Sequence, residues 1–175
     1  MPKIILYIAQ SLDGYISTPD GSVAWLDDFN NTGDDLGYTN FIKNIDVNIQ
    51  GSKTYKQVLG FDISYPYSGK SFVLTHKKLE KPKGSDIEFY SGDLKELVSK
   101  AKKQSKKNVW LIGGANVVQQ FLKESLIDEI ILFTMPVLLG KGISLFGSDG
   151  LSLKLNLTNT NNYSSGIIES HYQIN

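Results

Sequence analysis

The chain contains no cysteine and no arginine: all eighteen of its basic residues are lysine. The absence of cysteine excludes disulfides, thiolate catalysis and cysteine-based metal sites. The two histidines, His76 and His171, lie far apart in the sequence, so we expect no metal site. Arginine is the usual bidentate partner of carboxylates and phosphates, and here lysine must contact any anionic ligand as a point charge.

The sequence also lacks net charge and long hydrophobic runs. Eighteen acidic residues balance the lysines, which leaves no overall field to attract nucleic acid or an anionic membrane. No apolar run approaches the roughly 18 residues that a membrane-spanning helix needs. The opening segment MPKIILYIAQSLDG predicts a first strand, not a signal peptide. We therefore expect one cytoplasmic domain, 1–175, without a nucleic-acid or membrane partner.

Short apolar segments bounded by turn residues alternate with helical patterns along the chain. The expected strands are Ile4–Ala9, Val47–Gln50, Ser71–Thr75, Ile87–Tyr90, Val109–Ile112, Glu129–Met135, Leu151–Asn159 and Gly166–Ile174. The expected helices are Asp35–Ile45, Thr54–Leu59, Leu94–Gln104 and Asn116–Lys123. This alternation predicts an α/β fold, with a mostly parallel sheet covered by helices on both faces. The last two strands are predicted to form an antiparallel hairpin, with its turn in Asn159–Asn162 and Ser164–Ser165.

A glycine pair, Gly113-Gly114, separates the buried strand Val109–Ile112 from the helix that follows. Glycine lets the backbone approach a ligand closely, and a helix N-terminus offers free N–H groups to a phosphate. The segment therefore favours a dinucleotide site. A purely structural turn explains two glycines equally well, so the prediction depends on agreement with other segments.

Several further segments agree with it: IAQSLDGYI (Ile8–Ile16), QGSKTY (Gln50–Tyr55), SFVLTH (Ser71–His76), and LIGGA (Leu111–Ala115) followed by DEIILFTMPVLLGKGISLF. Over nearly its whole length the chain resembles the dihydrofolate reductase fold. It is most similar to the C-terminal reductase domain of the riboflavin-biosynthesis deaminase/reductases, the RibD C-terminal domain, and its stand-alone relatives. The resemblance implies an NADPH-dependent oxidoreductase that passes a hydride to a pyrimidine- or pteridine-type heterocycle or a ribosylamino substrate. It also implies a homodimer.

The resemblance assigns cofactor contacts to three groups of residues. It places the phosphates against Gly51, Ser52, Lys53 and Thr54, the adenosine 2′-phosphate near Thr75, His76 and Lys77, and the pyrophosphate and nicotinamide along Ala9, Ile112, Gly113, Gly114, Ala115, Asn116 and Val117. Ser52 stands where the family has an arginine, and Lys53 is the candidate replacement. Both Lys53 and Lys77 are equally well explained as surface lysines. The family often has a cis peptide between the two glycines, so we predict one at Gly113–Gly114.

For the substrate side, the resemblance implies contacts from Asp13 and Trp25 and a catalytic carboxylate at Asp35. Each has a structural alternative: Asp13 as a turn former, Trp25 as a packing residue, and Asp34 or Asp35 as a helix cap. If Asp35 is catalytic, its pocket should raise its pKa, and Thr134 should hydrogen-bond to it.

Three departures from the family pattern keep the activity open. Ala24 precedes Trp25 where a proline is usual, Val118 stands where an aromatic residue is usual, and no arginine is present to hold the folate carboxylate. The alternatives to a riboflavin-type reductase are therefore dihydrofolate reductase itself and a non-catalytic NADP-binding protein.

Overall fold

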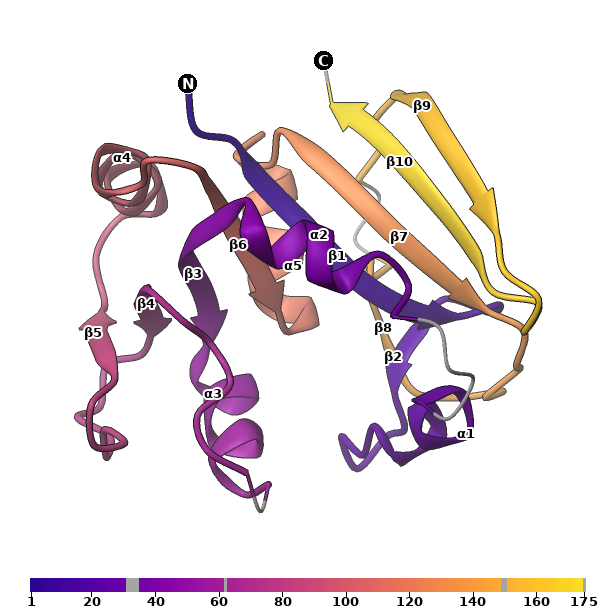
Figure 1. Ribbon diagram of the computed structural model, residues 1–175, viewed down its shortest axis with the longest axis horizontal. Coiled ribbons are helices and arrows are strands. Elements are labelled where there is room, and N and C mark those ends of the chain that lie inside the picture. Colours follow the sequence, from indigo (N-terminus) through magenta and orange to yellow (C-terminus); the bar gives the residue numbers. More distant parts are fainter. Residues whose placement is uncertain (31–34, 62, 149–150, 175) are drawn as a thin grey trace.

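The computed structural model describes residues 1–30, 35–61, 63–148 and 151–174, and its centre is one eight-stranded sheet with the order β5-β4-β3-β6-β1-β7-β10-β9 (Figure 1). The first six strands in this order run parallel, whereas β10 and β9 are antiparallel to their neighbours. The strands are β1 Ile4–Ser11, β3 Ile45–Gly51, β4 Lys70–Leu74, β5 Asp86–Tyr90, β6 Asn108–Gly113, β7 Glu129–Met135, β9 Leu155–Asn162 and β10 Ile168–Ile174. The predicted mostly parallel sheet with an antiparallel C-terminal hairpin is confirmed.

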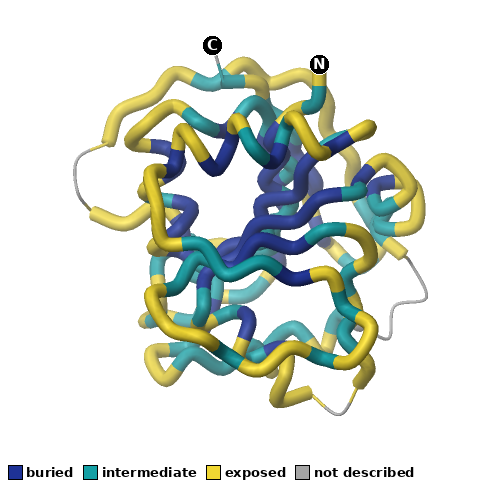
Figure 2. Tube along the Cα trace, turned by 90° about the vertical axis from the view of Figure 1, so that its left-hand side faces the viewer, coloured by how far each residue is buried: buried dark blue, intermediate teal, exposed yellow. Residues whose placement is uncertain are grey.

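Helices cover both faces of this sheet, as predicted. On one face α4 (Leu94–Gln104) and α5 (Ala115–Lys123) bury Leu97 and Phe121 against Leu6 and Phe72. The strands that carry these contacts lie in the buried centre of the molecule (Figure 2). Asp93 accepts hydrogen bonds from the N–H groups of Lys95 and Glu96 and so caps α4, as its position predicts.

The opposite face carries a layer of aromatic rings under α2 (Tyr38–Lys43). Tyr7 of β1 stacks on Phe41 with 4.2 Å between ring centroids. Trp110 of β6 meets Phe41 edge to face at 5.3 Å. Such pairs stabilise a core beyond the area that they bury. α3 (Ser52–Leu59) follows β3, and the short helices η1 (Ala24–Leu26) and α1 (Asp27–Asn30) follow the short strand β2 (Tyr15–Ser17).

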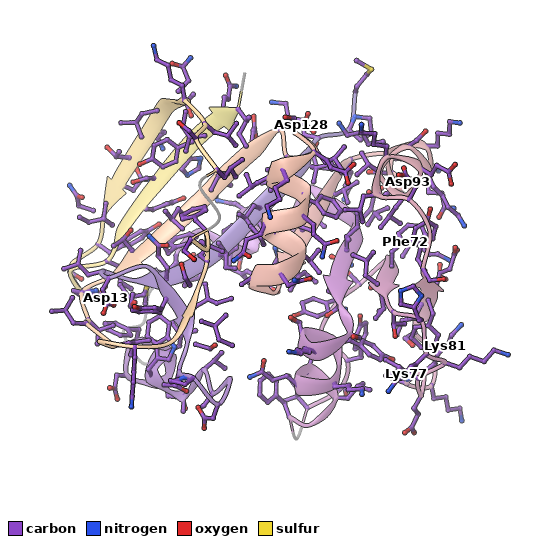
Figure 3. All side chains as sticks on the ribbon, turned by 180° about the vertical axis from the view of Figure 1, so that it is seen from behind. Asp13, Phe72, Lys77, Lys81, Asp93 and Asp128 are labelled. Atoms are coloured by element: carbon purple, nitrogen blue, oxygen red, sulfur yellow. The ribbon has the colours of Figure 1, made fainter. Side chains whose placement is uncertain are left out.

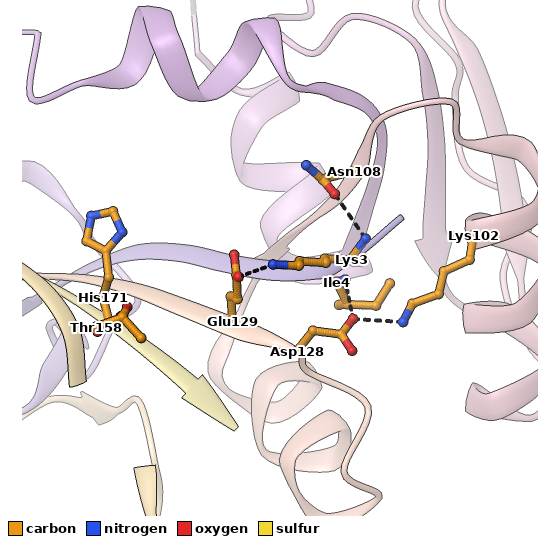
Figure 4. A network of polar contacts seen from close by, with 8 residues as sticks. All are labelled: Lys3, Ile4, Lys102, Asn108, Asp128, Glu129, Thr158 and His171. Atoms are coloured by element: carbon orange, nitrogen blue, oxygen red, sulfur yellow. Dashed lines mark hydrogen bonds and ion pairs between the residues drawn. The ribbon is translucent and has the colours of Figure 1, made fainter. Parts of the chain in front are cut away.

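Polar contacts connect the amino ends of three strands (Figure 4). Asp128, at the start of β7, accepts hydrogen bonds from the Ile4 N–H at 2.6 Å and from Lys102 Nζ at 2.7 Å. The Lys3 N–H donates to Asn108 Oδ1 at 3.0 Å. These contacts fix the amino ends of β1, β6 and β7. The glycines Gly51 and Gly113 lie at the other edge of the sheet, where β3 and β6 end.

Three expectations about individual elements are wrong, and one small sheet was not predicted. The predicted helix Asp35–Ile45 is shorter, because the chain starts α2 only at Tyr38 and Ile45 already belongs to β3. Asn159–Asn162 lies inside β9, and the turn follows at 163–166. The predicted strand Leu151–Asn159 starts at Leu155. The small sheet of β2 (Tyr15–Ser17) and β8 (Ile143–Ser144) was not expected, because segments this short carry no periodic signal.

In the part of the chain that the structure describes, no helix is long and apolar enough to cross a membrane. The same residues contain no group of three or more acidic, histidine or cysteine side chains that could hold a metal ion.

Candidate functional site

Two glycine turns meet at the carboxyl edge of the parallel strands. β3 passes into α3 at Gly51, and β6 passes into α5 at Gly113 and Gly114. A Cβ at Gly51 would lie 2.9 Å from Val117 Cγ2 and 3.7 Å from the Gly113 carbonyl oxygen, and one at Gly114 would lie 3.2 Å from Thr54 Oγ1. Gly51, Thr54, Gly113, Gly114 and Val117 therefore lie together, and we call this group the glycine cradle.

The glycine cradle also brings two helix N-termini side by side. Gly51 and Gly114 are the N-cap residues of α3 and α5, and neither helix start receives a side-chain cap. Their first N–H groups therefore remain available to a ligand, in contrast to the capped start of α4. The Gly113–Gly114 peptide is cis, as predicted.

Next to the glycine cradle the sheet divides (Figure 1). β1 pairs with β6 only from Ile4 to Leu6, then continues beside β7 to Ser11, whereas β6 continues beside β3. The Lys3 carbonyl accepts a hydrogen bond from the Val109 N–H of β6, and the Ile4 carbonyl accepts one from the Asp128 N–H just before β7. Backbone groups alternate along a strand, so those of odd-numbered residues face β6.

Trp110 Nε1 donates to the carbonyl of Tyr7 at 3.2 Å, and Ala9 lies beyond the last β1–β6 pair. The N–H and C=O groups of Ala9 thus face the opening between the two strands. A backbone edge with one donor and one acceptor matches a planar amide.

The residues expected at the adenosine end lie at the end of β4. The Thr75 N–H donates to the Tyr90 carbonyl at 2.8 Å, and Thr75 Oγ1 accepts from the Lys77 N–H at 3.0 Å. His76 and Lys77 are exposed, as is Lys53 in the first turn of α3. Figure 3 shows Lys77 and Asp13 at opposite sides of the molecule. The glycine cradle and Thr75 both follow the carboxyl ends of parallel neighbouring strands, so these contacts share one edge of the sheet, which suits an elongated ligand.

Asp13 connects two loops. Its carboxylate accepts hydrogen bonds from Ser11 Oγ at 2.6 Å and from the N–H groups of Gly140 at 2.7 Å and Leu139 at 3.1 Å. These bonds, the one from Ser11 above all, hold the pKa of Asp13 below its usual value. The S-x-D-G turn and the P-V-x-x-G loop, two separate sequence motifs, are thus one structural unit.

Trp25 packs against a buried cluster formed by Phe133, Met135 and Ile167 on the α2 side of the sheet. Trp25 therefore packs against the core, as the structural alternative to a substrate contact predicts. Its indole Nε1 is buried, and the N–H has no acceptor among the described residues.

The expectation that a pocket raises the pKa of Asp35 is wrong. Asp35 is exposed, and its carboxylate accepts from the N–H groups of Gly37 at 2.9 Å and Thr39 at 3.1 Å. A hydrogen bond from the Thr39 hydroxyl, followed by these backbone bonds, lowers the pKa of Asp35. Asp35 thus has the partners of a residue that fixes a helix start. Asp34, the other capping candidate, lies outside the described residues.

The expected contact between Asp35 and Thr134 is also wrong. Phe133 packs in the cluster that contains Leu36, the neighbour of Asp35. Side chains alternate between the faces of a strand, so Thr134 belongs to the α5 side, with Ile130 and Leu132. The sequence therefore predicts the strand that carries Thr134 correctly, but Thr134 lies on the face of that strand away from Asp35.

The sequence and the fold are similar to those of known proteins. Residues 62–168 match the RibD C-terminal domain. The uncharacterized protein YwjB of Bacillus subtilis (strain 168) is 35% identical over 97% of this chain and 97% of its own.

The chain belongs to the RibD C-terminal domain family.

Solved structures agree with this assignment. A putative riboflavin biosynthesis protein from Shewanella sp. PV-4 superposes with a TM-score of 0.88, at 31% identity and 99% coverage of both chains. The dihydrofolate reductase of Enterococcus faecalis, solved with NADP(H) and RAB-propyl, superposes with a TM-score of 0.69, at 16% identity, covering 99% of this chain and 96% of its own. This RibD-type chain therefore has the dihydrofolate reductase-like fold, in a reductase family of the riboflavin-biosynthesis type.

The RibD-type site fits a dinucleotide on its own geometry. A side chain at Gly51 or Gly114 would fill the space beside Val117 and Thr54, so the absence of a Cβ at both positions keeps this space open. Uncapped helix starts at this point offer N–H groups to a diphosphate.

Two polar residues on this sheet escaped sequence reasoning. Glu169 of β10 is buried and accepts from Tyr163 OH at 2.6 Å and Asn161 Nδ2 at 2.9 Å. Gln10 of β1 has a buried side-chain oxygen without a described partner. Glu169 lies within the predicted strand Gly166–Ile174, and Gln10 follows directly after the predicted strand Ile4–Ala9, inside the longer β1. A polar residue at a strand position that should be buried is the signal that identifies them.

Proposed function

We propose that this protein is an NADPH-dependent reductase of a ribosylamino-pyrimidine, similar to 5-amino-6-(5-phosphoribosylamino)uracil reductase. The observation that carries the proposal is the glycine cradle, in which two uncapped helix starts meet beside the opening between β1 and β6. Membership of the RibD C-terminal domain family supports the substrate class.

In this proposal the chain binds and aligns the reactants. The helix starts of α3 and α5 bind the diphosphate, while Thr75 and Lys77 lie at the adenosine end. NADPH, when bound, supplies the hydride for the carbon of a C=N bond, and a proton adds at nitrogen. Tyr7 and Trp110 lie at the start of the opening, and their packing with the buried Phe41 holds this part of the two strands in place.

The test measures binding and turnover separately. We expect NADPH and NADP⁺ to raise the unfolding temperature, and NADPH absorbance to fall when the phosphoribosylaminouracil is added. Dihydrofolate and methotrexate form the second arm: tight methotrexate binding with dihydrofolate turnover would replace the proposal by dihydrofolate reductase. Stabilisation by NADPH without oxidation across pyrimidines, pteridines and flavins would support the non-catalytic alternative.

We also propose that the protein is a cytoplasmic homodimer without a nucleic-acid or membrane partner. β9 forms an edge of the sheet, and Leu157 on it is 57% exposed. An exposed apolar edge is commonly covered by a second copy. Light scattering measures the mass directly, and a particle of 19.4 kDa would contradict the dimer.

A further inference from the structure

Gln10 lies on β1 just after Ala9, at the point where β1 has left β6. Side chains alternate along the strand, so Gln10 shares the α5-facing side with Leu6 and Ile8. Ile8 Cδ1 lies 3.6 Å from the position of a Cβ on Gly113. Side chains on this face of β1 therefore reach the end of β6 across the opening.

The Oε1 atom of Gln10 is buried, and no described residue donates a hydrogen bond to it. Buried polar atoms in folded proteins almost always have a partner, because an unpaired acceptor loses its water without compensation. Three other side-chain atoms share this condition: Trp25 Nε1, Gln50 Oε1 and Ser165 Oγ. Of these four residues, Gln10 is the one that lies on β1, next to the backbone groups of Ala9 that face the opening.

These groups have the hydrogen-bonding complement of a primary carboxamide. A carboxamide has one acceptor oxygen and two N–H donors. The backbone of Ala9 offers one N–H and one C=O toward the opening, which leaves one carboxamide N–H without a partner. Gln10 Oε1 supplies the second acceptor.

We propose that Gln10 positions the nicotinamide ring by accepting a hydrogen bond from its carboxamide group. This inference rests on the proposed function, since it concerns the same cofactor site. Gln10 is a positioning residue: it fixes the rotation of the ring, and therefore which face of the ring meets the substrate. It also makes the site selective for a carboxamide over an acetyl group of the same shape.

The test compares three ligands by calorimetry. NADP⁺ has the carboxamide, 3-acetylpyridine adenine dinucleotide phosphate replaces its NH₂ by methyl, and 2′,5′-ADP lacks the ring. We expect the wild type to bind NADP⁺ about tenfold more tightly than the acetyl analogue, the size of effect that a hydrogen bond to a buried acceptor carries. The acetyl analogue also loses the N–H that faces the Ala9 carbonyl, so Gln10→Leu should lower this ratio several-fold without abolishing it. It should leave 2′,5′-ADP affinity unchanged.

Gln104→Leu, an exposed glutamine at the end of α4, is the matched control and should keep the wild-type ratio. Thermal unfolding adds a second readout: Gln10→Leu should keep the stability of the free protein but gain less from NADP⁺. If Gln10→Leu fails to fold, wild-type protein alone decides, because equal affinity for NADP⁺ and the acetyl analogue overturns the inference.

The outcomes separate the two proposals. Binding of NADP⁺ with an unchanged ratio in Gln10→Leu overturns the role of Gln10 and leaves the reductase proposal intact. Absence of binding by NADP⁺ and by 2′,5′-ADP overturns the proposed function and, with it, the role of Gln10.

Discussion

Asp13 and Asp35 are exposed carboxylates that the fold uses in the same way. Each accepts hydrogen bonds from a nearby hydroxyl and from backbone N–H groups, and each has a lowered pKa for that reason. A general acid at neutral pH needs the opposite shift, toward a higher pKa. At the scale of single residues, the structure thus supports a positional role for both side chains.

Asp35→Asn separates the two roles of this residue. The asparagine oxygen still accepts from one of the two N–H groups, that of Gly37 or that of Thr39. The local fold is therefore largely kept, and we expect reductase turnover within about threefold of wild type. If Asp35 supplied the proton, the same change would cost about 10²–10⁴-fold. Turnover is measured by NADPH oxidation. Asp35→Ala, which removes the acceptor, should lower the unfolding temperature and serves as the comparison for the capping role.

At the scale of elements, the sequence predicts α4 and β7 to the residue, because each has a clear start signal and an uninterrupted pattern. It also predicts the glycine turn after β6, which follows a strand and precedes a helix, whereas the resemblance to the family assigned Gly51 and Gly114 to one site. The face of Thr134 could not be predicted, because one residue of error in register inverts every side chain of a strand. Neither could the partners of Asp35 be predicted, because they depend on where α2 begins.

Gly51→Ala tests the packing of α3 against α5. The new methyl would lie 2.9 Å from Val117 Cγ2, so one helix start must move. We expect a loss of about 1–3 kcal/mol in the free energy of unfolding, as overpacking typically costs. NADP⁺ affinity, measured by calorimetry, should fall by about tenfold or more, equivalent to roughly 1.4 kcal/mol.

Val117→Ala in the same chain removes the clashing methyl groups and should restore part of the affinity. Gly60→Ala makes the same change at the other end of α3, where φ is −81°, and should leave NADP⁺ binding at the wild-type value. If Gly51→Ala lowers NADP⁺ affinity equally in the presence and absence of Val117→Ala, the contact with Val117 is not the cause of the lost affinity.

On the scale of the whole molecule, the parallel sheet that carries the glycine cradle is extended by the β9–β10 hairpin. Glu169 connects the hairpin strands, since Asn161 lies on β9 and His171 on β10. Tyr163, in the turn between the two strands, donates to the same carboxylate. Burial alone would raise the pKa of Glu169, but the hydrogen bonds from Tyr163, Asn161 and His171 outweigh it and lower the pKa.

The lowered pKa predicts how Glu169→Gln changes stability with pH. The charged carboxylate favours folding, so its contribution is complete above the unfolded carboxyl pKa of 4.5 and is lost as the pH falls through the lower pKa of the folded state. At pH 7 the free energy of unfolding of the variant should be lower by about 2 kcal/mol. The reason is that the NH₂ group of the new glutamine would face groups that already donate hydrogen bonds, such as Asn161 Nδ2 and Tyr163 OH. Urea unfolding from neutral to acidic pH should show the free energies of unfolding of wild type and Glu169→Gln converge.

Glu124→Gln, at an exposed position, is the matched control and should show no such convergence. A constant difference between wild type and Glu169→Gln across that pH range would show that packing, not charge, holds the hairpin.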